Sequence, residues 1–277
     1  MSKLRKAMEK ARAARVAAGE APPSEGQERV AQQAPLRETQ PQSNGSTDEV
    51  NPAYTQTRIV PVNPDVLKRN KVFAFFQGHP MADSLKILQT QVLGRLEALG
   101  GNTIMVTSAN RAEGKTLMTV NLAVSMAREL DRTVLLVDTN LRSPSLLEIL
   151  GMEPQRGLSD YLLKEAGIPD LLIHPGIQKL VLLPSGRPLS HSAELLGSPR
   201  MEALVREMRE RYSKRLVLFD SPALLTSADA LAFSRFVDGI LLVAENEKTR
   251  RNEIKRMFEL LEGKPVLGTV LNKAMMS

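Results

Sequence analysis

The sequence has no cysteine, no long apolar run and only three tyrosines in 277 residues. Without cysteine, disulfides and thiolate metal sites are excluded. No apolar run approaches the roughly 18 residues that a membrane span needs, and no stretch reads as a signal peptide. The hydrophobic content of 42% is still ample for a core. We therefore expect a cytoplasmic protein with one large domain or two small ones.

The net charge is also small over most of the chain, although the whole sequence has a net charge of +6 and a pI of about 9.6. Six basic residues and one acidic residue fall within the first nineteen positions, which leaves a net charge of +1 for all the others. A nearly neutral body with one basic end is poor evidence for a nucleic-acid groove. We expect no nucleic-acid partner.

The composition divides the chain into three regions. Residues 1–19 are rich in helix formers with a thin apolar stripe, and they predict a basic N-terminal helix. That helix could be solvated, dock onto a partner or lie on a membrane surface. Residues 20–65 are dominated by Pro, Gln, Ser, Glu, Asn and Thr, and they predict a disordered linker. Residues 66–277 are expected to form the folded domain.

Within this domain, short apolar runs alternate with helical stretches. The runs are 103–108, 133–138, 179–184, 215–220, 239–244 and 266–272, and the helical stretches are 83–99, 116–130, 198–212, 228–236 and 249–263. Runs that are apolar on both faces are typical of buried parallel strands. The alternation predicts an α/β fold with a doubly wound, mainly parallel sheet, in which ligands bind beyond the carboxyl ends of the strands.

The first of these carboxyl ends carries a phosphate-binding loop. The stretch "TSANRAEGKT" (107–116) follows a predicted strand and opens a predicted helix, although Ala109 stands where the motif has its first glycine. Backbone N–H groups of such a loop cradle phosphates, while the lysine neutralises the outer phosphates and the hydroxyl reaches Mg²⁺. The predicted nucleotide-binding residues of this stretch are Ala112, Glu113, Gly114, Lys115, Thr116 and Leu117.

Two further strands end in carboxylates. "TVLLVD" ends in Asp138 and "RLVLFD" ends in Asp220. Carboxylates at the ends of buried strands, in a sheet that also carries Gly-Lys-Thr, suit a Mg²⁺–nucleotide site. We therefore predict Thr116, Asp138 and Asp220 as the metal ligands.

These blocks resemble the bacterial tyrosine kinases of capsular and exopolysaccharide synthesis, over about residues 80–277. The loop is similar to TSxxPGEGKS, "LLVDTNLR" to the variant second Walker motif DxDxR, and "GTVLNK" to the closing strand. "MSKLRKAMEKA" looks like the exosortase-associated tyrosine autokinases. The resemblance implies a P-loop fold of the deviant-Walker ATPase type with ATP and Mg²⁺. It implies catalytic roles for Lys115, Asp138, Arg142 and Asp220, and it places Asn272 near the base.

The resemblance also implies a setting. The expected partner is a membrane chain-length determinant protein of a polysaccharide export system, with the kinase at the inner face of the cytoplasmic membrane. A homo-oligomer is expected as well, but its motif ExxRxxR reads Asp83-x-x-Lys86-x-x-Gln89 in this sequence. The second aspartate of DxDxR is Asn140, and the family's C-terminal tyrosine cluster has no counterpart.

Three functions remain open. The first is a tyrosine kinase that regulates polysaccharide chain length and export, and the second is a nucleotide-dependent regulator without kinase activity. The third, a partitioning-type ATPase, is disfavoured because its signature lysine position holds Asn110. Tyr161 and Tyr212 are expected to be packing residues. We therefore expect weak or absent autophosphorylation, with any transfer going to Tyr54 in the linker or to a separate partner protein.

Overall fold

The computed structural model describes residues 57–128, 132–210 and 215–274. The predicted N-terminal helix and most of the predicted linker lie outside these ranges, as do Tyr54 and Tyr212. Within them, no helix is both long enough and apolar enough to cross a membrane. The strands are β1 (Arg58–Ile59), β2 (Thr103–Ser108), β3 (Thr133–Asp138), β4 (Ile173–His174), β5 (Leu180–Leu183), β6 (Arg215–Asp220), β7 (Gly239–Glu245) and β8 (Val266–Asn272). The helices are α2 (Pro64–Arg69), η1 (Phe73–Phe75), α3 (Pro80–Ala98), α4 (Lys115–Ala127), α5 (Leu146–Leu150), α6 (Leu158–Leu162), α7 (Ile168–Leu171), α8 (Ser192–Leu196), α9 (Pro199–Glu210), α10 (Ala228–Phe233), η2 (Ser234–Phe236) and α11 (Arg251–Leu260).

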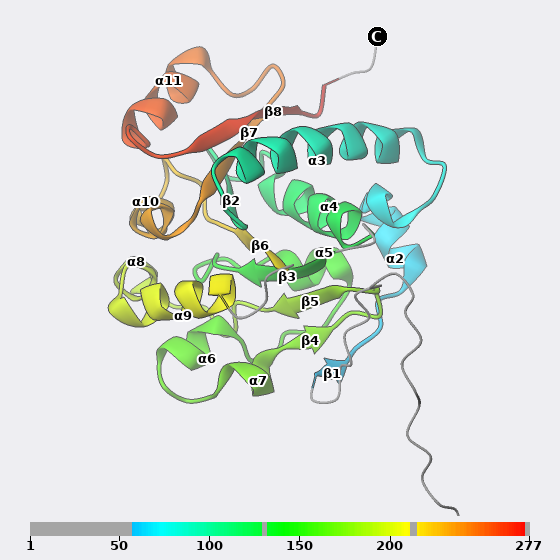
Figure 1. Cartoon of the computed structure of the whole chain (residues 1–277), viewed down its shortest axis with the longest axis vertical. Coiled ribbons are helices and arrows are strands. Elements are labelled where there is room, and N and C mark those ends of the chain that lie inside the picture. Colours follow the sequence, from blue (N-terminus) through cyan, green and yellow to red (C-terminus); the bar gives the residue numbers. More distant parts are fainter. Residues whose placement is uncertain (1–56, 129–131, 211–214, 275–277) are drawn as a thin grey trace, which may run out of the picture. The chain divides into compact units, whose positions relative to one another are not determined.

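The eight strands form one sheet in the order β1-β4-β5-β3-β6-β2-β7-β8 (Figure 1). In the sheet order from β5 to β8, every pairing is parallel. Strand β4 pairs antiparallel with β5, and β1 pairs parallel with β4. The six predicted apolar runs are the six strands of the parallel part. The predicted mainly parallel sheet is therefore confirmed.

Helices cover both faces of this sheet. On β2, Ile104 and Val106 join a core shared with α2–α5, whereas Met105 joins a second core shared with α6–α11. Successive side chains of a strand point to opposite faces, so a run that is apolar throughout supplies both cores. Figure 1 shows α3 and α4 on one side of the sheet and α6–α9 on the other. The fold is doubly wound, as the sequence predicts.

The folded region begins before the boundary expected at residue 66. Strand β1 pairs with β4, and Val60 and Val62 pack against the first core. Helix α2 starts at Pro64 and is capped by Asn63, whose Oδ1 accepts the Asp65 N–H at 2.9 Å. An Asn cap followed by Pro in the first turn is a helix start signal. The average composition of 20–65 conceals that signal, and residues 57–65 belong to the folded region and not to the predicted linker.

Candidate functional site

The phosphate loop connects β2 to α4, and its shape depends on two residues with left-handed backbone. Gly114, at the N-terminus of α4, has a φ of 89°, and Ala112 has a φ of 63°. A Cβ on Gly114 would lie 2.1 Å from Asn272 Nδ2. Glycine is therefore required at 114 both by the backbone conformation and by the close approach of β8.

The Thr116 hydroxyl lies at the centre of the polar contacts beneath the loop. It donates to Asp220 Oδ2 at 2.8 Å and lies 3.4 Å from Lys115 Nζ. The Ser145 hydroxyl approaches it to 3.3 Å from the connection after β3. The first turn of α4 thereby brings a cation and a hydroxyl against a strand-end carboxylate.

Asp138 and Asp220 form a buried pair of carboxylates. They are register partners at the ends of β3 and β6, and their exposed fractions are 1% and 0%. Burial, followed by the charge of Asp220, raises the pKa of Asp138 to about 8, while the Asn140 N–H and Lys115 act in the opposite direction. Burial also raises the pKa of Asp220, against the nearby Lys115 charge and the Thr116 hydroxyl. In the absence of a cation, the pair therefore retains a proton at neutral pH.

This donor set fits Mg²⁺. Asp138 Oδ2 is buried and has no hydrogen-bond partner of normal geometry among the described residues, although the Ser185 hydroxyl lies close enough to lower the pKa of this carboxyl group, so the oxygen can accept a cation. The described part of the chain holds no group of three or more His, Cys, Asp or Glu side chains that would form a metal cage. Mg²⁺ typically takes one or two carboxylates and completes its shell with water and substrate phosphates.

A cavity of about 170 Å³ opens in front of the loop. It is lined by Arg111, Ala112, Lys115, Asn140, Arg142, Ser143, Ser145, Pro222, Ala223, Thr226 and Ser227. Ligand pockets usually measure about 300–1,000 Å³, so the enclosed part suits the phosphate end of a nucleotide rather than a whole one. Three cationic side chains and several hydroxyls make this part of the site suitable for anions.

Arg142 is held at the cavity by a buried carboxylate. Its Nε donates to Ser192 Oγ at 2.9 Å and lies 3.3 Å from Asp229 Oδ2. Ser192 in turn donates to Asp229 at 2.5 Å. These contacts fix the Nε edge of the guanidinium, and Asp229 itself is fully buried at the start of α10.

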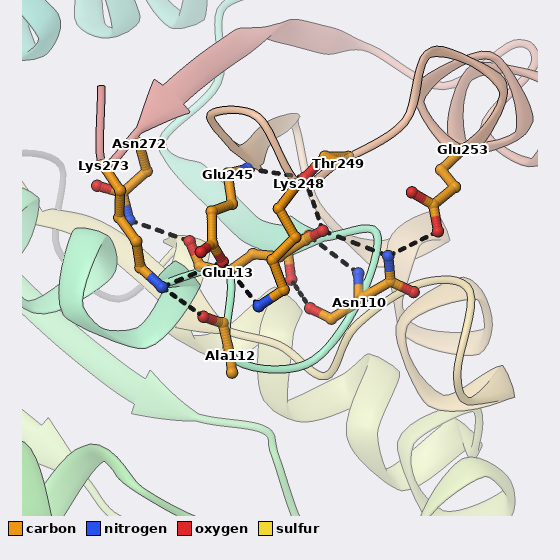
Figure 2. Close-up of polar contacts among 10 residues, drawn as sticks. Asn110, Ala112, Glu113, Glu245, Lys248, Thr249, Glu253, Asn272 and Lys273 are labelled. Carbon is orange, nitrogen blue, oxygen red and sulfur yellow. Dashed lines mark hydrogen bonds and ion pairs between the residues drawn. The ribbon is translucent and has the colours of Figure 1, made fainter. Parts of the chain in front are cut away.

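The structure brings four of the predicted site residues together and places Asn272 elsewhere. Lys115, Thr116, Asp138 and Asp220 converge at the carboxyl ends of β2, β3 and β6. Asn272 lies against the loop instead of the cavity, and its Nδ2 donates to the Glu113 carbonyl at 3.0 Å (Figure 2).

Two other predicted residues offer backbone rather than side-chain atoms to a nucleotide. Leu117 packs its side chain against the first core, which leaves its N–H in the first turn of α4. The Glu113 carboxylate is buried among Asn110 and Thr249 (Figure 2).

Sequence reasoning missed several residues that complete the site. Thr119 lies near Asp220, with Oγ1 3.4 Å from Oδ1. It follows Thr116 by three positions on one helix face, so the spacing alone contained that signal. Asp229 and Thr249 reach the site only through tertiary contacts, and nothing local distinguishes them.

Comparisons with known proteins place this geometry in a family. No family model matches the chain. Tyrosine-protein kinase YwqD of Bacillus subtilis (strain 168) is 33% identical over 172 residues, which are 61% of this chain and 71% of YwqD. Succinoglycan biosynthesis transport protein ExoP of Rhizobium meliloti (strain 1021) is 36% identical over 180 residues, 63% of this chain. The chain spans only 22% of ExoP.

Solved structures agree with these relatives. The chimerical protein CapA2B2 matches with a TM-score of 0.69 and 26% identity, over 79% of this chain and 94% of that one. The septum site-determining protein MinD of Pyrococcus horikoshii OT3 shares the fold, with a TM-score of 0.53 and 24% identity over 64% of this chain and 72% of MinD. The chain has the P-loop ATPase fold, and it belongs to the bacterial tyrosine-protein kinases of capsule and exopolysaccharide biosynthesis.

Proposed function

We propose that this domain binds Mg²⁺–ATP at the carboxyl edge of β2, β3 and β6 and transfers its γ-phosphoryl group to a tyrosine hydroxyl. The observation that carries the proposal is the convergence of Lys115, Thr116, Asp138 and Asp220 beneath a loop of phosphate-binding shape. MinD, which shares the fold, was solved with Mg-ADP. That structure supports the same cofactors for this chain.

Each side chain has a distinct role in this proposal. Lys115 neutralises the outer phosphates, while Thr116, Asp138 and Asp220 hold Mg²⁺. The metal, when bound, neutralises the charge that builds up on the phosphates during transfer. Arg142, anchored through Nε by Ser192 and Asp229, directs its remaining N–H groups to the transferred phosphoryl group.

Asp138 is the proton acceptor in this proposal. In the transfer, the bond from the γ-phosphorus to the β–γ bridging oxygen breaks and a bond to the tyrosine oxygen forms. The hydroxyl proton passes to Asp138, directly or through water. The Asn140 N–H, which donates to Asp138 Oδ1 at 2.9 Å, fixes the orientation of the carboxylate, as a general base requires.

The test is a phosphorylation assay with γ-labelled ATP. The purified chain is incubated with Mg²⁺ and labelled ATP, alone and with its membrane partner, and phosphotyrosine is located by mass spectrometry. Metal-dependent label that is lost in Lys115→Ala supports the proposal. Absence of nucleotide binding in the wild-type protein would refute it.

A nucleotide-dependent regulator without transfer is the second candidate, and Asn140 favours it. This residue lines the cavity where the family motif has an aspartate, and its Nδ2 donates to the Ser143 carbonyl at 2.6 Å. The acceptor side therefore lacks one negative charge. Tight Mg²⁺–ADP binding without label, with transfer gained in Asn140→Asp, would identify this function.

For the setting, we propose a membrane chain-length protein of a polysaccharide export system as the partner, at the inner face of the membrane. The name of ExoP, a succinoglycan biosynthesis transport protein, supports such a system. Assembly into a ring through the ExxRxxR position is disfavoured. Gln89 is buried and bonded to Ser125 at 2.6 Å, while Asp83 and Lys86 pair with each other.

A further inference from the structure

The outer side of the phosphate loop is held by residues that arrive from the far end of the sequence (Figure 2). Four side chains form what we call the loop clamp: Asn110 and Glu113 of the loop, with Thr249 and Glu253 around the start of α11. Within the loop clamp, Thr249 bonds to Glu113 across 136 positions of the sequence, and Asn110 bonds to Glu253 across 143 positions. It does not line the cavity.

Glu113 is the centre of the loop clamp, and its contacts are directional. Its carboxylate is fully buried and accepts the Asn110 N–H at 2.9 Å and the Thr249 hydroxyl at 2.7 Å. The same Thr249 oxygen accepts the Glu245 N–H at 2.8 Å. Its single proton is therefore directed to Glu113, and a buried carboxylate that loses such a donor keeps its desolvation cost.

The second arm of the loop clamp joins the loop to the N-terminus of α11. Asn110 Nδ2 donates to Glu253 Oε1 at 2.9 Å, and Glu253 Oε2 accepts the Arg250 N–H at 2.7 Å. Glu253 thus caps the helix and anchors the loop at once. A shift of this helix start therefore shifts Asn110.

The loop needs such external support because Ala112 is strained. Its φ of 63° lies in the left-handed region, which is unfavourable for a residue with a Cβ. Lys273 Nζ binds the Ala112 carbonyl at 3.0 Å, and Asn272 binds the Glu113 carbonyl. In a planar trans peptide the N–H points opposite to the C=O, so these bonds direct the N–H groups of Glu113 and Gly114 away from β8.

We propose that the loop clamp is a set of positioning residues that hold the phosphate loop in its phosphate-binding conformation and thereby couple the start of α11 to nucleotide affinity. The proposal rests on the proposed function, since the ligand is the Mg²⁺–nucleotide. None of the four side chains is assigned a contact with that ligand.

The experiment compares Thr249→Val, which keeps the shape and loses the donor, with Thr249→Ser, which keeps the hydroxyl. Calorimetry with Mg²⁺–ADP should give about tenfold weaker binding for Thr249→Val and near wild-type binding for Thr249→Ser. Hydrogen exchange of residues 109–114 without nucleotide should accelerate in Thr249→Val only. Arg256→Ala is the control on the same helix, because Arg256 pairs with Glu259 of α11 and has no role in the loop clamp.

If the loop clamp only stabilised the fold, Thr249→Val would lower the Tm but leave the ADP affinity and the hydrogen exchange of the loop unchanged. That result would overturn the proposal. Glu113→Gln provides a second variant, whose amide cannot satisfy all the donors around it, and it should weaken binding in the same way. If the wild-type protein fails to bind ADP, the proposed function fails. The exchange comparison then still decides whether the loop clamp holds the loop.

Discussion

Asp138 and Asp220 face each other across neighbouring parallel strands, as register partners with almost no exposed surface. Two carboxylates in this position repel each other and lose hydration, so the folded domain favours their protonated form. A cation or a proton must compensate the pair. The stability of the nucleotide-free domain should therefore depend on pH in a specific direction.

We expect the free energy of unfolding to fall as pH rises from about 4 to about 8. In this window the folded state keeps a proton on Asp138, whose pKa is about 8, and the unfolded state does not. Asp138 alone contributes at most about 1.4 kcal/mol per pH unit to this slope. Urea unfolding from pH 5 to 9 should show a flatter profile for Asp138→Asn, with the exposed Asp83→Asn as control. Parallel profiles for wild type and Asp138→Asn would contradict this.

Lys115→Ala should preserve the fold and lose function. Lys115 is at the first position of α4, where alanine is a good helix former, and the one hydrogen bond that its Nζ makes to a described residue is a long one to Thr116 Oγ1, at 3.4 Å. Loss of this preorganised charge should lower phosphoryl transfer by about 10²–10³-fold. Circular dichroism and the labelled-ATP assay test the two halves of the prediction. Wild-type transfer rates in the variant would exclude Lys115 from the site.

Truncation should distinguish residue 57 from residue 66 as the start of the domain. A chain that starts at 57 should keep its stability. A chain that starts at 66 loses β1, the Asn63 cap and the packing of Val60 and Val62, and it should be less stable by about 2–4 kcal/mol. Thermal unfolding of both chains checks this. Equal Tm values would show that β1 adds nothing.

Ala112→Gly and Ala109→Gly should act in opposite directions. Glycine at 112 relieves the left-handed strain and should stabilise the domain by up to about 1 kcal/mol. Ala109 is fully buried in the second core, so glycine there removes a packed methyl group and should cost about 1 kcal/mol. Denaturant unfolding measures both changes. A destabilised Ala112→Gly would mean that the methyl group makes a contact that outweighs the strain.

The sequence predicts the parallel strands and the main site residues because those signals are local. An apolar run that ends in Asp138 or Asp220 predicts both a buried strand and a carboxylate at the end of that strand. Helices α5 to α8 are four or five residues long, too short to display a helical period. Tyr161 packs against the second core beneath Arg200, as predicted.

The contacts around the loop could not be predicted in this way. Thr249 and Glu253 occur in a basic, polar helix start that is typical of a solvated surface. Only the fold brings them to Asn110 and Glu113. Pairings across more than 130 residues leave no trace in local composition.

The contact of Lys273 with Ala112, across 161 residues, has a consequence for the order of events during synthesis. The ribosome makes the phosphate loop long before it makes β8. Until Asn272 and Lys273 have emerged and docked, the loop carbonyls lack their outer donors. We therefore expect the loop to reach its observed conformation only after β8 has docked, so that the proposed nucleotide site is completed late in synthesis.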